Sequence, residues 1–320
     1  MTAPLSKFAP NLTSSFIPHP QATHVLDELE FMLDHLRHTG EALGYRLTGP
    51  TNAGKSTVMK ELWRRYPPVK TATGNQHTVL YVHLVERAKL VDVYVGILRA
   101  LGDPAHRIGT EKELRYRARD MLRRTGVMLL IFDEPHHLTQ ARSDGARLGL
   151  TQLGKSLIDD GLSVVFAGVK SVDDLVAESD ELARRFRGKP SLGPYRVSNT
   201  EDVKAMRVFC DAVGTRLQHV KPVQLGTDTF WFSRLLAASN GLVGVISQIV
   251  SQAESRARGS GDGELTLRHL SLAWRNFSGS GEQRLQHLQT PTGSRLVDVF
   301  SVDDDTVHAI VGRLVSESSR

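Results

Sequence analysis

The chain has 320 residues, which is enough for one large domain or two modest domains with a hydrophobic core. Hydrophobic residues make up 40% of it and charged residues 23%, as in soluble globular proteins, and the single cysteine, Cys210, excludes an internal disulfide framework. The net charge of +5 is a mild excess that is compatible with a nucleic-acid partner but indicates none by itself.

Residues 1–21 are rich in proline, serine and threonine, which predicts an extended N-terminal arm. The first residues lack the apolar core of a signal peptide, and no stretch approaches membrane-spanning length. With a single cysteine, we therefore expect a cytoplasmic protein without a membrane partner. A helix is predicted over 22–39, because apolar residues recur there at helical spacing.

A phosphate-binding loop follows a short predicted strand at 44–48. Residues 49–56 read Gly-Pro-Thr-Asn-Ala-Gly-Lys-Ser and match the pattern Gly, four residues, Gly-Lys-Ser/Thr. Its glycines let successive backbone N–H groups point at phosphate oxygens. Lys55 is expected to reach the β- and γ-phosphates, and Ser56 to bind Mg²⁺. The expected nucleotide-binding residues are Gly49, Pro50, Thr51, Asn52, Ala53, Gly54, Lys55, Ser56 and Thr57.

An acidic strand downstream completes this pattern. The elements predicted between the loop and that strand are a helix at 55–66, a strand at 78–84 and helices at 89–101 and 110–125. The apolar strand at 127–132 is followed by two carboxylates. Asp133 is expected to hold Mg²⁺, and Glu134 to polarise the attacking water. Together the two motifs predict that the chain binds a nucleoside triphosphate.

Strands and helices alternate up to residue 198, with a further helix around Leu148–Ile158 and a strand at 162–167. This alternation predicts a parallel sheet covered by helices on both faces. The later pattern is helical only, over 200–217, 228–239, 242–257 and 266–277. We expect four segments: an arm (1–21), an α/β nucleotide-binding domain (22–198), a small all-helical lid (199–277), and a flexible linker and tail (278–320) with a short helix at 303–316.

This order of elements resembles the AAA+ ATPases, which place a strand before the Walker B strand and a helical lid after the α/β domain. The detail resembles the TniB family, ATPase subunits of bacterial transposons, over roughly residues 15–275. The residues that carry the resemblance are Phe132-Asp133-Glu134-Pro135-His136-His137-Leu138, Arg142, Arg147, Leu153, Leu157, Val164-Val165-Phe166-Ala167-Gly168 and Asp180-Glu181-Leu182-Ala183-Arg184-Arg185-Phe186.

The resemblance implies a P-loop AAA+ ATPase that uses ATP and Mg²⁺. Such proteins assemble as rings or filaments on duplex DNA without sequence preference, recruit a DDE-type transposase, and release DNA when ATP is hydrolysed. Two departures of this sequence from the AAA+ pattern favour slow, assembly-gated hydrolysis. The fourth strand ends Ala167-Gly168-Val169, which leaves Lys170 or Ser171 to orient the water, and Gly241-Leu242-Val243-Gly244 lacks the arginine of the usual Gly-x-x-Arg in the lid.

Arg184 and Arg185 precede Phe186, where the resemblance places an arginine finger donated to the neighbouring subunit. A cation supplied in trans would stabilise charge on the transferring phosphoryl group. A solvated basic turn explains the pair equally well, because Arg187 and Lys189 follow directly. Of the two, we favour Arg185 as the finger.

Arg115, Arg119 and Arg123 recur every four residues and predict one basic helical face. Contact with DNA phosphates is one interpretation, and ion pairing with the acidic residues of the same helix is the favoured one. By resemblance, the basic residues nearer the DNA channel of related rings are Arg99, Arg107, Lys112 and Arg115, and these are the expected DNA contacts.

Two smaller features have two interpretations each. His136-His137 suggests a metal site, but no second cluster of histidine or cysteine accompanies it, so a polar helix start beside the nucleotide is favoured. By resemblance, residues 16–18 of the arm close over the adenine base; ordinary local packing explains them equally well.

Three functions remain open from the sequence. The first is a transposition ATPase, the second a helicase-loader or initiator-like ATPase of replication, and the third a signalling NTPase that binds protein partners. ATP-dependent binding to duplex DNA that weakens steeply with salt separates the first two from the third.

Overall fold

The computed structural model describes residue 12 and residues 15–72, 74–85, 88–135, 144–177, 179–279, 289–290 and 293–318. Contacts between residues divide the chain into two compact units. The α/β unit comprises Gln21–Leu192, and the helical unit combines Met1–Pro20 with Gly193–Arg320. The segment boundaries expected from the sequence, at residues 21, 198 and 277, remain predictions.

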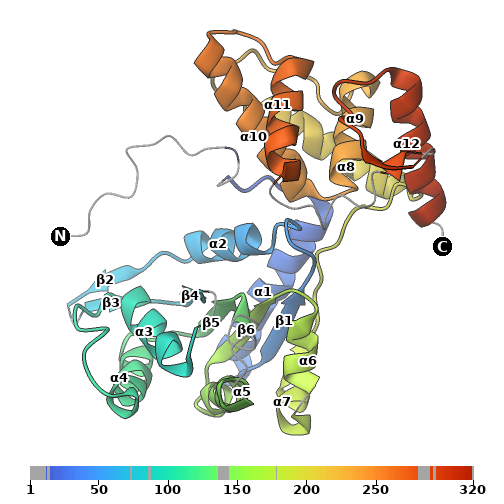
Figure 1. Ribbon diagram of the computed structural model, residues 1–320. Coiled ribbons are helices and arrows are strands. Elements are labelled where there is room, and N and C mark those ends of the chain that lie inside the picture. Colours follow the sequence, from blue (N-terminus) through green and yellow to red (C-terminus); the bar gives the residue numbers. More distant parts are fainter. Residues whose placement is uncertain are drawn as a thin grey trace. The chain divides into compact units, whose positions relative to one another are not determined.

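A five-stranded sheet forms the centre of the α/β unit (Figure 1). Its strand order is β4-β5-β6-β1-β7, and every neighbouring pair is parallel, which confirms the predicted parallel sheet. The strands are β1 (Gly44–Thr48), β4 (Val79–His83), β5 (Leu129–Asp133), β6 (Ser163–Gly168) and β7 (Phe186–Gly188). Because the strands are parallel, the carboxyl ends of β1, β4 and β5 lie along one edge of the sheet, where open α/β sheets bind ligands.

Helices cover the sheet on both faces. The helices of the α/β unit are α1 (Pro20–Thr39), α2 (Lys55–Arg65), α3 (Leu90–Ala100), α4 (Glu111–Arg124), α5 (Asp144–Asp159), α6 (Ser171–Ala177) and α7 (Asp180–Arg185). Alternate strand residues such as Phe132 and Phe166 share one core with side chains from α3 to α7. Residues one position along, such as Tyr81 and Asp133, therefore face the side on which α2 packs against β4, β5 and β6.

Two parts of the α/β unit have no counterpart in the sequence-based expectations. β2 (Val69–Thr71) and β3 (Gly74–Gln76) form an antiparallel hairpin whose residues are all exposed. β7 adds a fifth strand beside β1. Each strand has three residues, which is too short for an alternating pattern to be recognised.

The second unit is built mainly from helices, as predicted. They are α8 (Thr200–Gly214), α9 (Thr229–Ser239), α10 (Val243–Ser260) and α11 (Leu267–Gly279). Side chains fix where two of them begin: Asn199 accepts hydrogen bonds from the first turn of α8, and Asp228 accepts one from the Phe230 N–H of α9. Apolar residues of all four helices form one continuous core.

The ends of the chain also contribute to this core. The contributing side chains are Leu12 and Ile17 from the arm and Val299, Phe300 and Ile310 from the C-terminal segment. A further helix, α12 (Asp304–Ser318), packs against α9, where the buried Arg234 pairs with Asp304 at 2.7 Å. A short hairpin, β8 (Gln289–Thr290) with β9 (Gly293–Leu296), precedes it. Val299 and Phe300 lie in the segment predicted as linker and tail, and α12 lies where its short helix was expected at 303–316. The boundary of that segment at residue 278 remains a prediction.

Within the described ranges, no single helix is long and apolar enough to cross a membrane. α9 and α10 pass that test only as a pair, by length and composition alone, and they are bent by 116° at the break between them.

Candidate functional site

The phosphate-binding loop connects β1 to α2. The Gly49 N–H donates to the Gly168 carbonyl at the end of β6 (3.2 Å), and the Leu192 N–H donates to the Thr48 carbonyl (2.9 Å). A Cβ atom at Gly49 would lie 2.0 Å from the Leu192 carbonyl oxygen, so only glycine fits at this position. Gly54 adopts a left-handed backbone (φ 94°) at the point where the loop turns into the helix.

Lys55 opens α2, and its side chain folds back over the loop. Its Nζ atom donates to the carbonyl oxygens of Gly49 (2.8 Å) and Pro50 (2.9 Å), and the residue is 4% exposed. Burial lowers the pKa of Lys55, and the negative charges of Glu134 and Asp133 act in the opposite direction. The ammonium group is therefore held inside the loop and close to both carboxylates.

The start of α2 provides backbone donors for an anion. The first N–H groups of a helix have no acceptor within the helix. No side chain caps α2, and its first turn is preceded by the left-handed residues Asn52 (φ 65°) and Gly54. The free N–H groups and the positive end of the helix dipole therefore point toward the loop. This arrangement binds phosphate oxygens.

Asp133 ends β5 and is completely buried. The Tyr81 hydroxyl donates to its Oδ2 atom at 2.5 Å, and the His83 Nδ1 atom lies 3.6 Å from the same oxygen. The Ser56 side chain also acts on this carboxylate and lowers its pKa. Burial by itself would raise the pKa of Asp133, but these three contacts outweigh it and hold the pKa below its usual value. The contact with Asp133 also raises the pKa of His83.

Tyr81 and His83 are site residues that the sequence did not reveal. Both lie on β4, and His83 is the direct register partner of Asp133. Their signal was two polar side chains near the carboxyl end of a strand that precedes the acidic strand. That signal becomes meaningful only once β4 is known to pair with β5.

The two residues expected to hold Mg²⁺ are brought into contact by the fold. The Ser56 side chain lowers the pKa of Asp133, and the Oδ1 atom of Asp133 is buried without a hydrogen-bond partner among the described residues. An unpaired buried carboxylate oxygen beside a hydroxyl suits a hard cation, and magnesium in such sites takes most of its other ligands from water and phosphate. No cluster of three histidine, cysteine or acidic residues that could hold a metal occurs in the described ranges. The carboxylate of Asp133 and the hydroxyl of Ser56 are the oxygen donors that fit magnesium accompanied by a nucleotide.

Glu134 follows Asp133 with a left-handed backbone (φ 59°), which is uncommon for a residue other than glycine. Its N–H donates to the Ala167 carbonyl of β6 at 2.7 Å, so the turn is fixed between two neighbouring strands. Its charge acts on the Lys55 ammonium group. Such local strain is often found at functional sites, in keeping with the role expected for Glu134.

The structure describes both segments in which the sequence departs from the family pattern. β6 ends at Gly168, Lys170 is exposed, and Ser171 begins α6. Gly241 in the helical unit has a left-handed backbone (φ 80°), and α10 begins at Val243. The water-orienting role of Lys170 or Ser171 remains a prediction.

Arg185 lies at the end of α7 and is held by acidic neighbours. Its guanidinium pairs with Asp159 at 2.8 Å and donates to the Glu181 carbonyl at 3.0 Å. Arg184 is exposed. The arginine-finger role of Arg185 remains a prediction, because that role is exercised on a neighbouring subunit.

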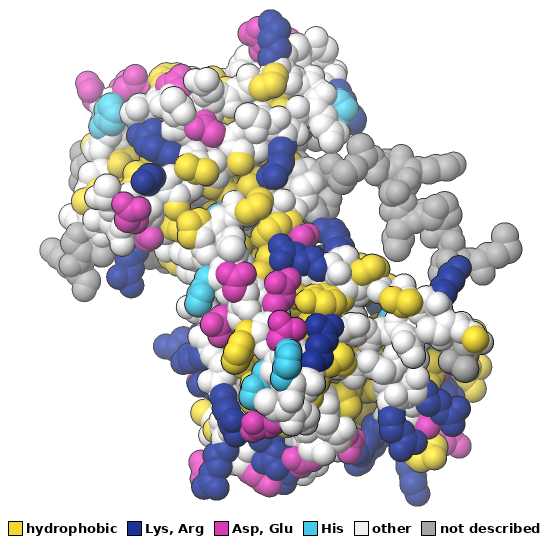
Figure 2. Space-filling model, turned by 180° about the vertical axis from the view of Figure 1, so that it is seen from behind, with side chains coloured by type: hydrophobic (Ala, Val, Ile, Leu, Met, Phe, Trp, Pro, Cys, Tyr) yellow, Lys and Arg dark blue, Asp and Glu magenta, His cyan; other side chains and the backbone are white. Residues whose placement is uncertain are grey.

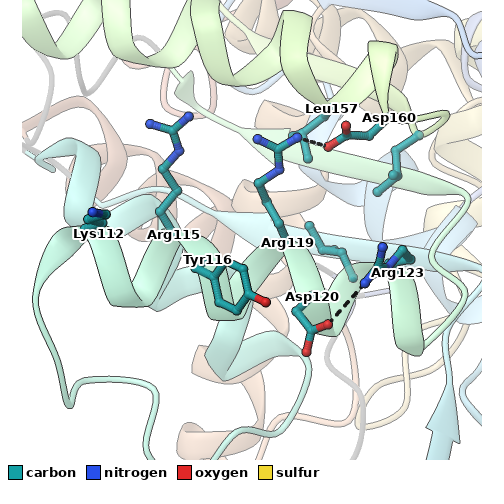
Figure 3. Close-up of a pocket in the computed structure, with 10 residues that line it drawn as sticks. Lys112, Arg115, Tyr116, Arg119, Asp120, Arg123, Leu157 and Asp160 are labelled. Carbon is teal, nitrogen blue, oxygen red and sulfur yellow. Dashed lines mark hydrogen bonds and ion pairs between the residues drawn. The ribbon is translucent and has the colours of Figure 1, made fainter.

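The basic stripe of α4 lines a cavity of about 740 Å³ (Figure 3). Arg119 pairs with Asp160 and Arg123 with Asp120, so two of the three arginines of the stripe have the ion-paired character that the sequence favoured. Lys112 and Arg115, by contrast, are exposed and make no ion pair with any described residue. Figure 2 shows Lys and Arg interspersed with Asp and Glu on one face of the α/β unit rather than gathered in one patch.

The remaining expected DNA contacts and smaller features are placed as follows. Arg99 is exposed in the last turn of α3, and Arg107 is exposed in the segment between α3 and α4. Ile17 packs in the core of the helical unit. Cys210 is buried in the same core, and burial raises the pKa of its thiol. His136 and His137 lie outside the described residues.

Comparisons with known proteins agree with this architecture. The family model described as "Bacterial TniB protein" matches residues 11–192, which include the whole α/β unit. A search of curated proteins gives no match.

Solved structures of similar fold cover most of the chain. Cdc6p from Pyrobaculum aerophilum has 13% identity and a TM-score of 0.57, with 96% of this chain and 98% of that chain covered. The ORC1 protein of Aeropyrum pernix, solved in complex with DNA, has 14% identity and a TM-score of 0.59, with 96% and 84% covered. Domain III of the replication initiation protein DnaA from Thermotoga maritima has 17% identity and a TM-score of 0.52, with 86% and 99% covered. At these identities the likeness shows the fold alone, which is that of P-loop AAA+ ATPases.

Proposed function

The chain belongs to the TniB family and has the AAA+ ATPase fold, and on that basis we propose that it is an ATP-dependent, DNA-binding regulator of DNA transposition. In this proposal it oligomerises on duplex DNA, helps to select the target, and recruits a DDE-type transposase. Hydrolysis of ATP controls its release from DNA. The observation that carries the proposal is the family match over the α/β unit that holds Lys55, Ser56 and Asp133 together.

The fold and the family imply nucleotide hydrolysis, and the site supports a division of labour among its residues. The loop N–H groups and Lys55 bind the phosphates, while Ser56 and Asp133 would hold Mg²⁺. A bound magnesium ion would neutralise charge that develops on the β- and γ-phosphates. Glu134 orients and polarises the attacking water. We propose slow turnover that depends on assembly, since the lid segment Gly241–Gly244 supplies no arginine.

Arg185 is proposed to complete the site of a neighbouring subunit, and its replacement tests this. For Arg185→Ala we expect ATP binding within twofold of wild type, but DNA-stimulated hydrolysis lower by about 10³-fold, the lower end of the effect of arginine fingers. Steady-state phosphate release on duplex DNA measures the rate. Arg184→Ala, which removes the adjacent exposed guanidinium, is the matched control and should leave the rate unchanged. Equal losses in both variants would contradict the assignment of Arg185.

Lys112 and Arg115 are proposed to contact DNA phosphates, together with Arg99 and Arg107. Each phosphate that the protein no longer neutralises should reduce the slope of log K against log salt concentration by about 0.9. We therefore expect the double variant Lys112→Ala/Arg115→Ala to bind duplex DNA more weakly, with a slope smaller by about 1.8, in fluorescence anisotropy with a non-hydrolysable ATP analogue.

The matched control removes two charges from the other end of the same helix. Arg123 and Arg124 both pair with Asp120, so Arg123→Ala/Arg124→Ala should leave the slope within experimental error of wild type. If the two double variants weaken DNA binding equally, the contacts are not at Lys112 and Arg115. Absence of ATP-dependent DNA binding by the wild-type chain would instead favour a signalling NTPase that binds protein partners.

A replication loader or initiator is the second candidate. The observation behind it is the structural likeness to domain III of the replication initiation protein DnaA, and the role is carried over from that protein only as a proposal. Co-purification of the chain with a DDE-type transposase on duplex DNA would support the transposition role. Stable association with a replicative helicase instead would support the second candidate.

A further inference from the structure

The strand β4 supplies a hydroxyl group to the site at a position that the phosphate-loop and acidic-strand motifs do not include. The Tyr81 hydroxyl donates to Asp133 Oδ2 at 2.5 Å, and the Ser56 side chain acts on the pKa of the same hydroxyl. The Lys60 ammonium lies 5.8 Å from the centre of the Tyr81 ring. One side chain on β4 therefore lies against α2 and binds the end of β5.

The register of the sheet explains how Tyr81 reaches this point. Tyr81 pairs with Ile131, two residues before Asp133, and all three residues belong to the face on which α2 packs. Two residues of a strand span about 6.6 Å, which a tyrosine side chain leaning along the strand can bridge with its hydroxyl. Phenylalanine at this position would keep the ring but leave the carboxylate without that donor.

The two oxygens of Asp133 consequently have different surroundings. Oδ2 accepts the hydrogen bond from Tyr81 and lies 3.6 Å from His83. Oδ1 is buried without a hydrogen-bond partner among the described residues. A donor on one oxygen restricts rotation of the carboxylate and keeps the other oxygen directed at its ligand, as outer-shell partners do for metal-binding carboxylates.

We propose that Tyr81 is a positioning residue that holds the Asp133 carboxylate and the Ser56 hydroxyl in the arrangement that binds magnesium with the nucleotide. This inference rests on the proposed function, which assigns Ser56 and Asp133 to the metal. Tyr81 thereby sets how much Mg²⁺ the site needs and acts on hydrolysis only through Asp133 and Ser56. If the hydroxyl instead competed with the ion for Oδ2, its removal would lower the Mg²⁺ concentration that the site needs.

The test measures magnesium dependence of binding rather than activity. The full chain and its Tyr81→Phe variant are mixed with a fluorescent non-hydrolysable ATP analogue and titrated with MgCl₂, starting in EDTA. We expect the half-saturating Mg²⁺ concentration to rise about 10-fold in the variant, the lower end of the effect of outer-shell partners. Affinity for the analogue in EDTA should stay within twofold, because the loop N–H groups and Lys55 are untouched.

Tyr94→Phe provides the matched control. Tyr94 is a buried tyrosine of α3 in the same unit, outside the set of residues that contact Asp133, so its loss of a hydroxyl should leave the Mg²⁺ titration unchanged. Thermal melting of both nucleotide-free variants checks that they are folded. An unchanged or lower half-saturating Mg²⁺ concentration in Tyr81→Phe would overturn the proposal. If the wild-type chain binds the analogue neither with nor without Mg²⁺, the proposed function itself fails and the role of Tyr81 falls with it.

Discussion

Lys55→Ala should weaken ATP binding by at least about 100-fold, or close to 3 kcal/mol, the largest loss of ATP affinity we expect from any single substitution. The ammonium group is nearly buried and held by two carbonyl oxygens of the loop, 2.8 and 2.9 Å away. It is therefore positioned before any phosphate arrives, which reduces the ordering cost that opposes its contribution to binding. Alanine removes the charge and leaves only the loop N–H groups to bind the phosphates.

Isothermal titration calorimetry with ATP and Mg²⁺ measures this loss. Lys70→Ala removes the same charge from the exposed β2–β3 hairpin and should bind ATP like wild type, because Lys70 is exposed on that hairpin. Melting of the nucleotide-free proteins shows whether Lys55→Ala is folded. A folded Lys55→Ala protein with undiminished ATP affinity would refute the assignment of the loop.

Glu134→Gln should trap the ATP-bound assembly on DNA. Glutamine keeps the size of the side chain and the left-handed turn at residue 134, but it cannot accept a proton from water. We expect hydrolysis to fall by about 10²- to 10⁴-fold, the contribution of a general base. ATP affinity should remain close to that of wild type, because Asp133 and Ser56 keep their contacts. The lifetime of the protein on DNA should lengthen in proportion to the loss of turnover.

Dissociation from labelled duplex DNA after dilution into excess unlabelled DNA measures this lifetime. Asp133→Asn is the matched control, since it makes the same chemical change one residue earlier on the buried carboxylate that contacts Ser56 and Tyr81. This variant should lose magnesium-dependent nucleotide binding, and its lifetime on DNA should not lengthen. If Glu134→Gln leaves DNA as quickly as wild type, hydrolysis does not time release.

The chemistry of the nucleotide site could be predicted from the sequence because it is encoded locally. Residues 49–56 need only their own glycines and the following helix to form a phosphate-binding loop, and a continuous apolar run ending in two carboxylates identifies a buried strand and its functional end. The alternation of strands and helices was likewise enough for the parallel sheet and for the mainly helical second unit. The resemblance to the TniB family was likewise recognised from local sequence motifs, and the match over residues 11–192 shows the family.

Other parts of the site depend on which segments become neighbours, and this is a property of the tertiary structure alone. Tyr81 and His83 join the site only because β4 pairs in register with β5. Arg185 has its partner Asp159 in another helix, 26 residues earlier. The segment around Val299 and Phe300 looked like a polar tail, because a few apolar residues carry no periodic signal, yet they are buried in the core of the helical unit. By itself the sequence thus predicted which groups would bind phosphate, whereas only the fold decided what holds Asp133 in place, because contacts between strands depend on strand order and register.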